Sequence, residues 1–277
     1  MQLRCGSKIL SFARPLVMGV LNVTPDSFSD GGRCLEPAAA VDNAVRMVEE
    51  GAAIIDVGGE STRPGAAPVA IEEELRRVIP VIEQLRSRVA VPISIDTRRA
   101  KVMRAALIAG ADMVNDVNAL QDLEAMRAVA NTDAAVCLMH MQGDPRSMQQ
   151  APHYNDVVTE VRDFLGDRVA ACRTAGIGEE RIVIDPGIGF GKTLDHNLRI
   201  ISRLLDFVWL GRPILIGVSR KSTIGAITDR PVEGRLAGSV ALATLAAWNG
   251  AAIIRAHDVA ATVDAMKIVA ALRGGAA

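Results

Sequence analysis

Short apolar segments rich in β-branched residues alternate with longer segments of helical period along the whole chain. The short segments are continuously apolar and lack strict polar/apolar alternation, which is typical of strands that are covered on both faces. Several helical patterns end at a glycine just before the next apolar segment, as Gly51, Gly110, Gly176 and Gly250 do. The predicted strands cover residues 16–23, 53–59, 92–97, 113–117, 134–140, 181–187, 213–219 and 252–257.

Repeated β-then-α units of this kind predict an α/β fold, a closed (β/α)8 or TIM barrel. The alternative is an open, doubly wound sheet, but its edge strands would need polar protection, and none of the segments shows it. A barrel of this class runs to about 250 residues as one unit, close to the length of this chain. We therefore expect residues 1–277 to form one domain.

Composition narrows the class of protein. The formal net charge is −1, so we expect neither nucleic acid nor an anionic membrane as a partner. The most apolar stretch, 238–254, is interrupted by Asn249 and Gly250 and reads as helix, turn and strand. No signal-peptide pattern opens the chain, and the four cysteines form no CxxC pair. We expect a cytoplasmic protein with reduced thiols.

Polar side chains follow every predicted strand. In barrel enzymes the active site lies at the carboxyl ends of the strands, on the loops that lead into the helices. Singly, Asp96 and Asp116 also fit helix or loop caps, Asp185 fits a turn, and His140 fits a core histidine. Eight polar strand ends on one rim favour a binding site. The residues concerned are Asn22, Glu60 to Arg63, Asp96, Asn115, Asp116, His140, Asp185, Ser219 to Ser222, Arg255 and His257.

Two kinds of chemistry are present on this rim. Asp96, Asn115 and Asp185 are flanked by apolar residues, so we expect them deep in the barrel, where unpaired polar groups are costly. Together they suit a flat heterocycle with N–H donors and ring acceptors, such as a purine or a pterin. Two carboxylates also fit the acid and base of a glycosidase, and this alternative stays open at this point.

The second group of residues on the rim is basic. Residues 219–222 and the Arg255/His257 pair follow strands seven and eight, the usual phosphate position of this fold. Arg63 adds a cation near strand two. A solvated surface cluster is the simpler explanation, but the position on the ligand rim favours an anionic substrate group and argues against a glycosidase.

Eight strings in order along the chain resemble the dihydropteroate synthase family. They are MGVLNVTPDSFSDGG, IIDVGGESTRPG, SIDT, VNDV, LMHMQG, DPGIGFGK, GVSRKS and RAHD, which together span strand one to strand eight. The resemblance implies a homodimeric barrel that needs Mg²⁺. It implies condensation of 6-hydroxymethyl-7,8-dihydropterin pyrophosphate with 4-aminobenzoate, giving 7,8-dihydropteroate and pyrophosphate for folate synthesis. Sulfonamides, which mimic 4-aminobenzoate, are the inhibitors that it implies.

The resemblance also assigns residues. Asn22 matches the Mg²⁺ ligand. The positions that match those holding the pterin pyrophosphate are Thr62, Asp96, Asn115, Asp185, Lys221, Arg255 and His257. Those that match the aminobenzoate pocket are Phe28, Pro64, Lys221 and Ser222. A small departure is Ile188, where the family often has phenylalanine.

The implied mechanism is dissociative: pyrophosphate leaves, the pterin methylene becomes cationic, and the neutral arylamine attacks it. Cations lower the barrier by taking up the charge of pyrophosphate, and carboxylates stabilise the methylene cation. We assign Asp30, Arg63, Asp96 and Lys221 as the catalytic set.

Two related functions are the alternatives. A pterin-binding methyltransferase barrel would share Asp96, Asn115 and Asp185 but would not need the polar segment after strand one or a phosphate site. A barrel that binds pterin without turnover should have lost residues from the first two loops, and none is visibly lost.

Overall fold

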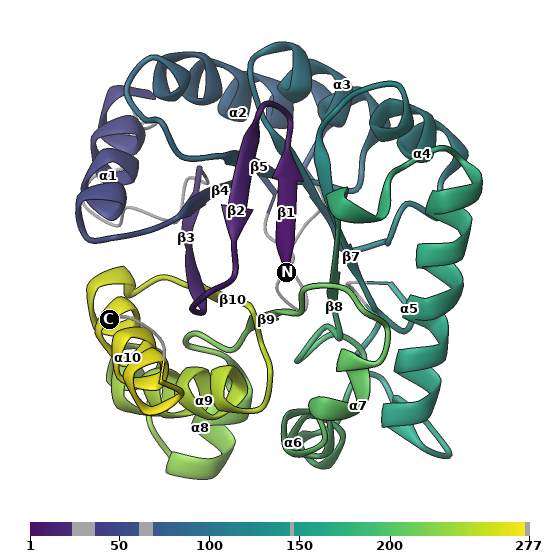
Figure 1. Cartoon of the computed structure of the whole chain (residues 1–277), viewed down its shortest axis with the longest axis vertical. Helices are drawn as coiled ribbons and strands as arrows, with labels where there is room; N and C mark the ends of the chain where they lie inside the picture. The colour runs from purple at the N-terminus through teal and green to yellow at the C-terminus, as the bar shows by residue number, and fades with distance from the viewer. Residues whose placement is uncertain (24–36, 61–68, 145–146, 275–277) are drawn as a thin grey trace.

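The computed structural model describes residues 1–23, 37–60, 69–144 and 147–274. Eight parallel strands follow one another in the order β8-β7-β6-β5-β4-β3-β10-β9. The two ends of this sheet meet: Ile184 pairs with Ile214 in a parallel bridge, and its N–H donates to the Pro213 carbonyl at 3.0 Å. The predicted barrel is confirmed, and the open sheet is not formed (Figure 1). The strands are β3 (Leu16–Asn22), β4 (Ile54–Gly58), β5 (Ile93–Asp96), β6 (Met113–Asp116), β7 (Ala135–Met139), β8 (Ile182–Asp185), β9 (Leu215–Gly217) and β10 (Ile253–Ala256).

Helices surround the ring of strands on its outer side (Figure 1). Gly51, Gly110, Gly176 and Gly250 follow helix ends with φ between +88° and +109°, a conformation that side chains with a Cβ rarely adopt. The helices are α1 (Pro37–Glu49), α2 (Ile71–Arg86), α3 (Ala100–Ile108), α4 (Leu123–Ala130), α5 (Val157–Thr174), α6 (Leu194–Ser202), α7 (Leu205–Val208), α8 (Ser222–Thr228), α9 (Leu236–Trp248) and α10 (Val259–Leu272). Among the described residues, short 3-10 helices cover Glu179–Arg181 and Val232–Gly234.

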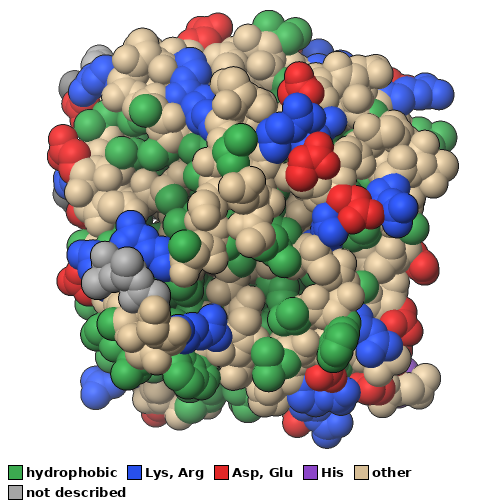
Figure 2. Space-filling view, in the orientation of Figure 1, with side chains coloured by type: hydrophobic (Ala, Val, Ile, Leu, Met, Phe, Trp, Pro, Cys, Tyr) green, Lys and Arg blue, Asp and Glu red, His purple; other side chains and the backbone are tan. Residues whose placement is uncertain are grey.

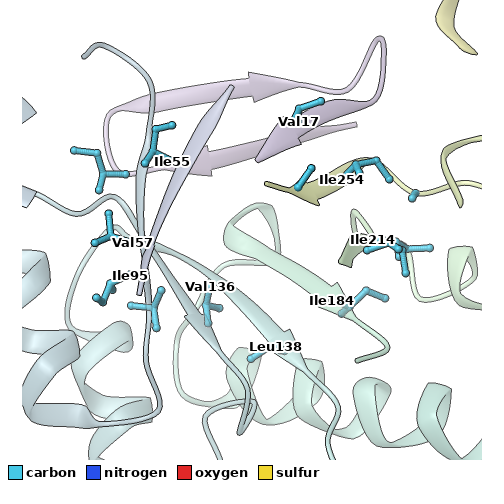
Figure 3. Packing of buried hydrophobic residues seen from close by; sticks show 14 of the residues in the cluster. Val17, Ile55, Val57, Ile95, Val136, Leu138, Ile184, Ile214 and Ile254 are labelled. Atoms are coloured by element: carbon cyan, nitrogen blue, oxygen red, sulfur yellow. The ribbon is translucent and has the colours of Figure 1, made fainter. Parts of the chain in front are cut away.

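Strand residues alternate between two separate apolar clusters. One set faces outward and packs against the helices, and Figure 3 labels its members Val17, Ile55, Val57, Ile95, Val136, Leu138, Ile184, Ile214 and Ile254. The other set faces the inside of the barrel and consists of Met18, Ile54, Met113, Ala135, Cys137, Val183, Leu215 and Ile253. Because side chains alternate along a strand, residues two positions beyond the inner set also point inward.

A β-hairpin that the sequence did not predict closes one end of the barrel. Strands β1 (Gln2–Cys5) and β2 (Lys8–Ser11) pair antiparallel around a turn at Gly6, whose φ is +59°. Leu3 and Cys5 are fully buried and belong to the inner apolar cluster. The hairpin lies across the centre of the ring in Figure 1, so the opposite end, where the strands finish, is the end left for a ligand.

The surface around the hairpin carries interspersed charges of both signs (Figure 2). No helix within the described ranges is long and apolar enough to cross a membrane. Cys5, Cys137 and Cys172 are buried free thiols, as the sequence predicts, while Cys34 lies outside the described residues.

We predict that Leu3→Ala lowers the free energy of unfolding by about 2–5 kcal/mol, because it leaves a cavity under the barrel interior. Ile9→Ala on the neighbouring strand of the hairpin is the matched control, since Ile9 is 64% exposed and should change stability little. Urea titration of both variants measures the difference. Equal losses would show that the hairpin does not plug the barrel.

Candidate active site

A row of inward positions crosses four adjacent strands at the carboxyl end of the barrel, here called the barrel mouth. Asn22 of β3 pairs in register with Gly58 of β4, Gly58 with Asp96 of β5, and Asp96 with Asn115 of β6. Gly58 has no side chain, and a Cβ placed there would lie 3.8 Å from both Asn22 Oδ1 and Asp96 Oδ2. The glycine therefore lets an amide oxygen and a carboxylate oxygen approach the same point.

The side chain of Arg255 on β10 reaches this row. Its Nε donates to Asp56 Oδ2 at 2.6 Å, and its Nη2 donates to Asp96 Oδ2 at 2.8 Å. Asn115 Nδ2 donates to the same Asp56 oxygen at 3.1 Å. Burial alone would lower the pKa of Arg255, but Asp56 and Asp96 raise it above its usual range. The guanidinium is thus a fixed cation that ties β10 to β4 and β5, and Asp56 in turn ties β4 to β6.

Asp96 has one oxygen without a partner among the described residues. Within the described part of the chain, its Oδ1 is buried and accepts no hydrogen bond, and the same holds for Asp56 Oδ1. Burial raises the pKa of Asp96 to about 7; Arg255 opposes this rise and Asp56 adds to it. An unpaired buried acceptor costs about 1–3 kcal/mol, so its presence at the mouth points to a donor supplied by a ligand.

Asp185 ends β8 beside this group. Its Oδ1 accepts the N–H of Gly187 at 2.7 Å, which fixes the carboxylate at the start of the following loop. Burial raises the pKa of Asp185, against the opposing charge of Lys221. Gly187 has φ +70°, and a Cβ on it would lie 1.9 Å from the carbonyl oxygen of His140. Only glycine fits there, so the turn and the carboxylate position depend on it.

Lys221 brings a second cation to the mouth. Its Nζ donates to the carbonyl of Ile188 and lies 4.8 Å from the centre of the Phe190 ring. Gly217 leaves space between the cations, since a Cβ there would lie 3.8 Å from Lys221 Nζ and 3.7 Å from Arg255 Cβ. Burial lowers the pKa of Lys221 to about 8, with Asp185 opposing the shift.

The other residues of the predicted basic cluster separate in the structure. His257 donates its backbone N–H to Ser219 Oγ at 3.1 Å, and its Nδ1 lies 3.0 Å from the same oxygen. Arg220 instead pairs with Asp258 through two hydrogen bonds of 3.0 and 2.5 Å. Ser222 is the exposed first residue of α8.

The structure therefore groups most of the predicted site residues that it describes. Six of these residues lie at or beside the inward layer of the mouth: Asn22, Asp96, Asn115, Asp185, Lys221 and Arg255. Five others lie outside the described residues: Phe28, Asp30, Thr62, Arg63 and Pro64.

Two residues of the predicted rim have the structural roles that the sequence also allowed, and one residue of the mouth was not predicted. Asp116 accepts the N–H groups of Asn118 and Leu120 and is a loop cap. His140 is a buried histidine, hydrogen-bonded to Lys192 at 2.9 Å. The missed residue is Asp56, although it stands two positions after inward-facing Ile54, and that alternation could have revealed it.

Comparison with known proteins agrees with this geometry. Residues 18–257 match the family described as "Pterin binding enzyme". The dihydropteroate synthase of Escherichia coli is 51% identical over 262 residues, which cover 95% of this chain and 93% of that protein. The chain belongs to the dihydropteroate synthase family.

Solved structures of the family superpose closely. A Yersinia pestis dihydropteroate synthase with a sulfonamide drug complex is 47% identical with a TM-score of 0.95, covering 99% of this chain and 100% of that one. A Xanthomonas albilineans dihydropteroate synthase in complex with 7,8-dihydropteroate is 50% identical with a TM-score of 0.90, covering 99% of each chain. The expected identity, a dihydropteroate synthase and therefore a transferase, is thereby confirmed, and the comparisons favour it over the methyltransferase alternative.

We predict that Arg255→Met destabilises the folded protein by about 3–5 kcal/mol near pH 8, because two buried carboxylates lose their counter-ion. The pKa of Asp96 lies above the 3.8 of an ordinary aspartate, so the folded state binds more protons and gains stability as pH falls. Removing Arg255 raises this pKa further, so the loss should shrink at about pH 5.

Urea unfolding at the two pH values measures this effect. Arg220→Met is the matched control, because the Arg220–Asp258 pair is partly exposed and should contribute about 0–1 kcal/mol with little pH dependence. A loss for Arg255→Met of the same size at both pH values would exclude a buried charge as its cause.

Proposed function

We propose that the inward polar layer of this barrel binds 6-hydroxymethyl-7,8-dihydropterin pyrophosphate and joins it to 4-aminobenzoate, giving 7,8-dihydropteroate for folate synthesis. The observation that carries the proposal is Asp96 Oδ1, which has no partner among the described residues, at a mouth that also carries Asn115, Asp185 and Arg255. A pterin ring supplies N–H donors and ring acceptors for such a set. The relative solved with 7,8-dihydropteroate supports this choice of ring.

Asp96, Asn115 and Asp185 recognise the pterin edge in this proposal. The Arg255–Asp56 pair and the Asn115–Asp56 hydrogen bond fix these groups before the ligand arrives, so little ordering is left for binding. A ring without matching donors would leave buried carboxylate oxygens unpaired, which rejects it by a factor on the order of 10⁴.

The pyrophosphate lies toward the loops after β9 and β10. Lys221, Arg255 and His257 hold it, together with Thr62 and Arg63. Two carboxylates already pair with Arg255, so Lys221 supplies further positive charge for the pyrophosphate.

Mg²⁺ is the cofactor that we propose, with Asn22 as its protein ligand. In the described ranges no three His, Cys, Asp or Glu side chains gather as a metal site. Asn22 Oδ1 and Asp96 Oδ2 nevertheless both lie 3.8 Å from the Cβ position of Gly58, and Mg²⁺ favours few protein oxygens together with substrate phosphates. The bound ion would supply charge neutralisation of the leaving pyrophosphate.

Bond breaking comes first in the proposed reaction. The C–O bond between the methylene and pyrophosphate breaks, and its electron pair leaves with pyrophosphate. Asp96, with Asp30 from the first loop, stabilises the methylene cation. The arylamine nitrogen then forms the C–N bond with its lone pair and releases one proton to solvent. The Lys221 and Arg63 charges hold the departing anion.

Aminobenzoate occupies the outer part of the mouth. Phe28, Pro64, Lys221 and Ser222 form its pocket in this proposal. A sulfonamide should compete for the same pocket, as the sulfonamide complex of the Yersinia pestis relative suggests.

We further propose that residues 1–277 act as one pterin-binding barrel domain, in the cytoplasm and as a homodimer. Support for the homodimer comes from large apolar side chains that are exposed on neighbouring helices. They are Leu205 and Val208 on α7, Leu245 and Trp248 on α9, and Ile268 and Leu272 on α10. Exposed apolar patches of this kind mark protein interfaces.

Purified protein should release pyrophosphate from dihydropterin pyrophosphate and 4-aminobenzoate, and we expect this turnover to require Mg²⁺. A coupled pyrophosphate assay, run with and without a chelator, measures both. Absence of turnover with Mg²⁺ present would refute the proposed reaction. Full turnover in excess chelator would refute the requirement for Mg²⁺ but not the proposed reaction.

Asp185→Asn should weaken pterin binding far more than aminobenzoate binding, by about 100-fold against less than threefold, because it removes a charged acceptor from the ring edge. Steady-state kinetics with each substrate varied in turn gives both KM values. Asp163→Asn, on the exposed face of α5, is the control and should change neither. Equal losses for the two substrates would contradict this division of the mouth.

A further inference from the structure

We infer that Lys192, together with His140, is a positioning residue of this enzyme: it fixes the loop after β8 so that Phe190 and Ile188 hold Lys221 in its working orientation. The inference rests on the proposed function, because that function places Lys221 in the aminobenzoate pocket.

Lys192 is a buried ammonium whose donors all meet neutral acceptors. It is 2% exposed, and its Nζ lies 2.9 Å from His140 Nδ1, 3.4 Å from the His140 carbonyl and 3.0 Å from the Phe190 carbonyl. Burial lowers the pKa of His140 to about 2, so its ring is neutral and Nδ1 accepts the hydrogen bond. No carboxylate of the described residues is in ion-pair contact with Lys192.

These bonds join the loop after β8 to the end of β7. The loop is pressed against β7 so closely that a Cβ on Gly187 or Gly191 would lie 1.9 Å or 2.3 Å from the carbonyl oxygens of His140 and Gln142. Tyr154 donates to the Gly191 carbonyl at 2.8 Å, and Asn197 Oδ1 accepts the Gly189 N–H at 2.7 Å. Lys192 is the side chain of the loop that reaches back into this junction.

The same loop holds Lys221 from its other side. Ile188 presents its carbonyl to Lys221 Nζ, and the ring of Phe190 lies 4.8 Å from that atom. Gly189 lies beside the Lys221 stem, since a Cβ on it would be 3.5 Å from Cδ. Because Lys192 bonds to the backbone of Phe190, its loss releases the residue that packs against Lys221.

Packing alone does not explain a lysine at this position. Burial lowers the pKa of Lys192 to about 7, with Asp185 opposing the shift, so keeping the ammonium there costs folding free energy. A buried apolar side chain of similar length would avoid that cost. Methionine cannot replace the directional N–H donors of the Lys192 ammonium.

Kinetics of Lys192→Met, with both substrates varied, tests the inference. We expect KM for 4-aminobenzoate to rise about tenfold, the effect of losing a charge-assisted hydrogen bond, and KM for dihydropterin pyrophosphate to rise as well, because Lys221 also holds the pyrophosphate. A merely structural role would lower the amount of active enzyme and leave both KM values unchanged. Lys101→Met, an exposed lysine paired with Glu72, is the control.

His140→Phe keeps a ring against Phe164 but removes Nδ1, so it should shift the same KM, and the double variant should show no additive loss. If Lys192→Met does not fold, Lys192→Gln, which retains donors, should give a smaller rise in the same KM. An aminobenzoate KM within twofold of wild type in the folded variant would overturn the inference. Absence of turnover by the wild-type protein would instead refute the proposed function.

Discussion

The buried contact of Arg255 with Asp56 and Asp96 is the constraint on which the mouth of this barrel depends. Its hydrogen bonds of 2.6 and 2.8 Å use one oxygen of each carboxylate and leave the other oxygen of each without a partner in the described structure. Removing one member of a buried charged group leaves its partners uncompensated, so the three residues must be kept together. Asn115 is oriented by the same group, through its hydrogen bond to Asp56.

Side chains that point alternately into and out of the barrel produce both the scaffold and the site. In β4, Ile54 faces the inner apolar cluster, Ile55 faces the helices, and Asp56 faces inward again at the mouth. In β10, Ile253 and Arg255 repeat this order. The inside of the barrel is therefore apolar near the hairpin and charged at the open end. The apolar layer stabilises the fold and supports the polar layer, which is costly to bury and suits a polar ring.

Sequence reasoning reached the barrel because a closed parallel sheet needs apolar strands covered on both faces, and this pattern is local. It also placed Asp96, Asn115 and Asp185 at one end, because all parallel strands finish there. It missed Asp56, whose partner Arg255 is 199 positions away, since no local pattern predicts that pair. It also missed the hairpin, whose two strands have four residues each. The role of Lys192 depends on His140, which follows β7 and is brought near only in the folded chain.

In the proposed function, Asp96 Oδ1, which has no partner among the described residues, accepts a hydrogen bond from the pterin ring. A crystal structure of this protein with 7,8-dihydropteroate tests it most directly. The account predicts that a ring N–H lies within hydrogen-bond distance of Asp96 Oδ1, while the contacts of Arg255 with Asp56 and Asp96 remain as they are here. A pterin ring bound at the mouth with Asp96 Oδ1 still unpartnered, or bound outside the mouth, would contradict the account.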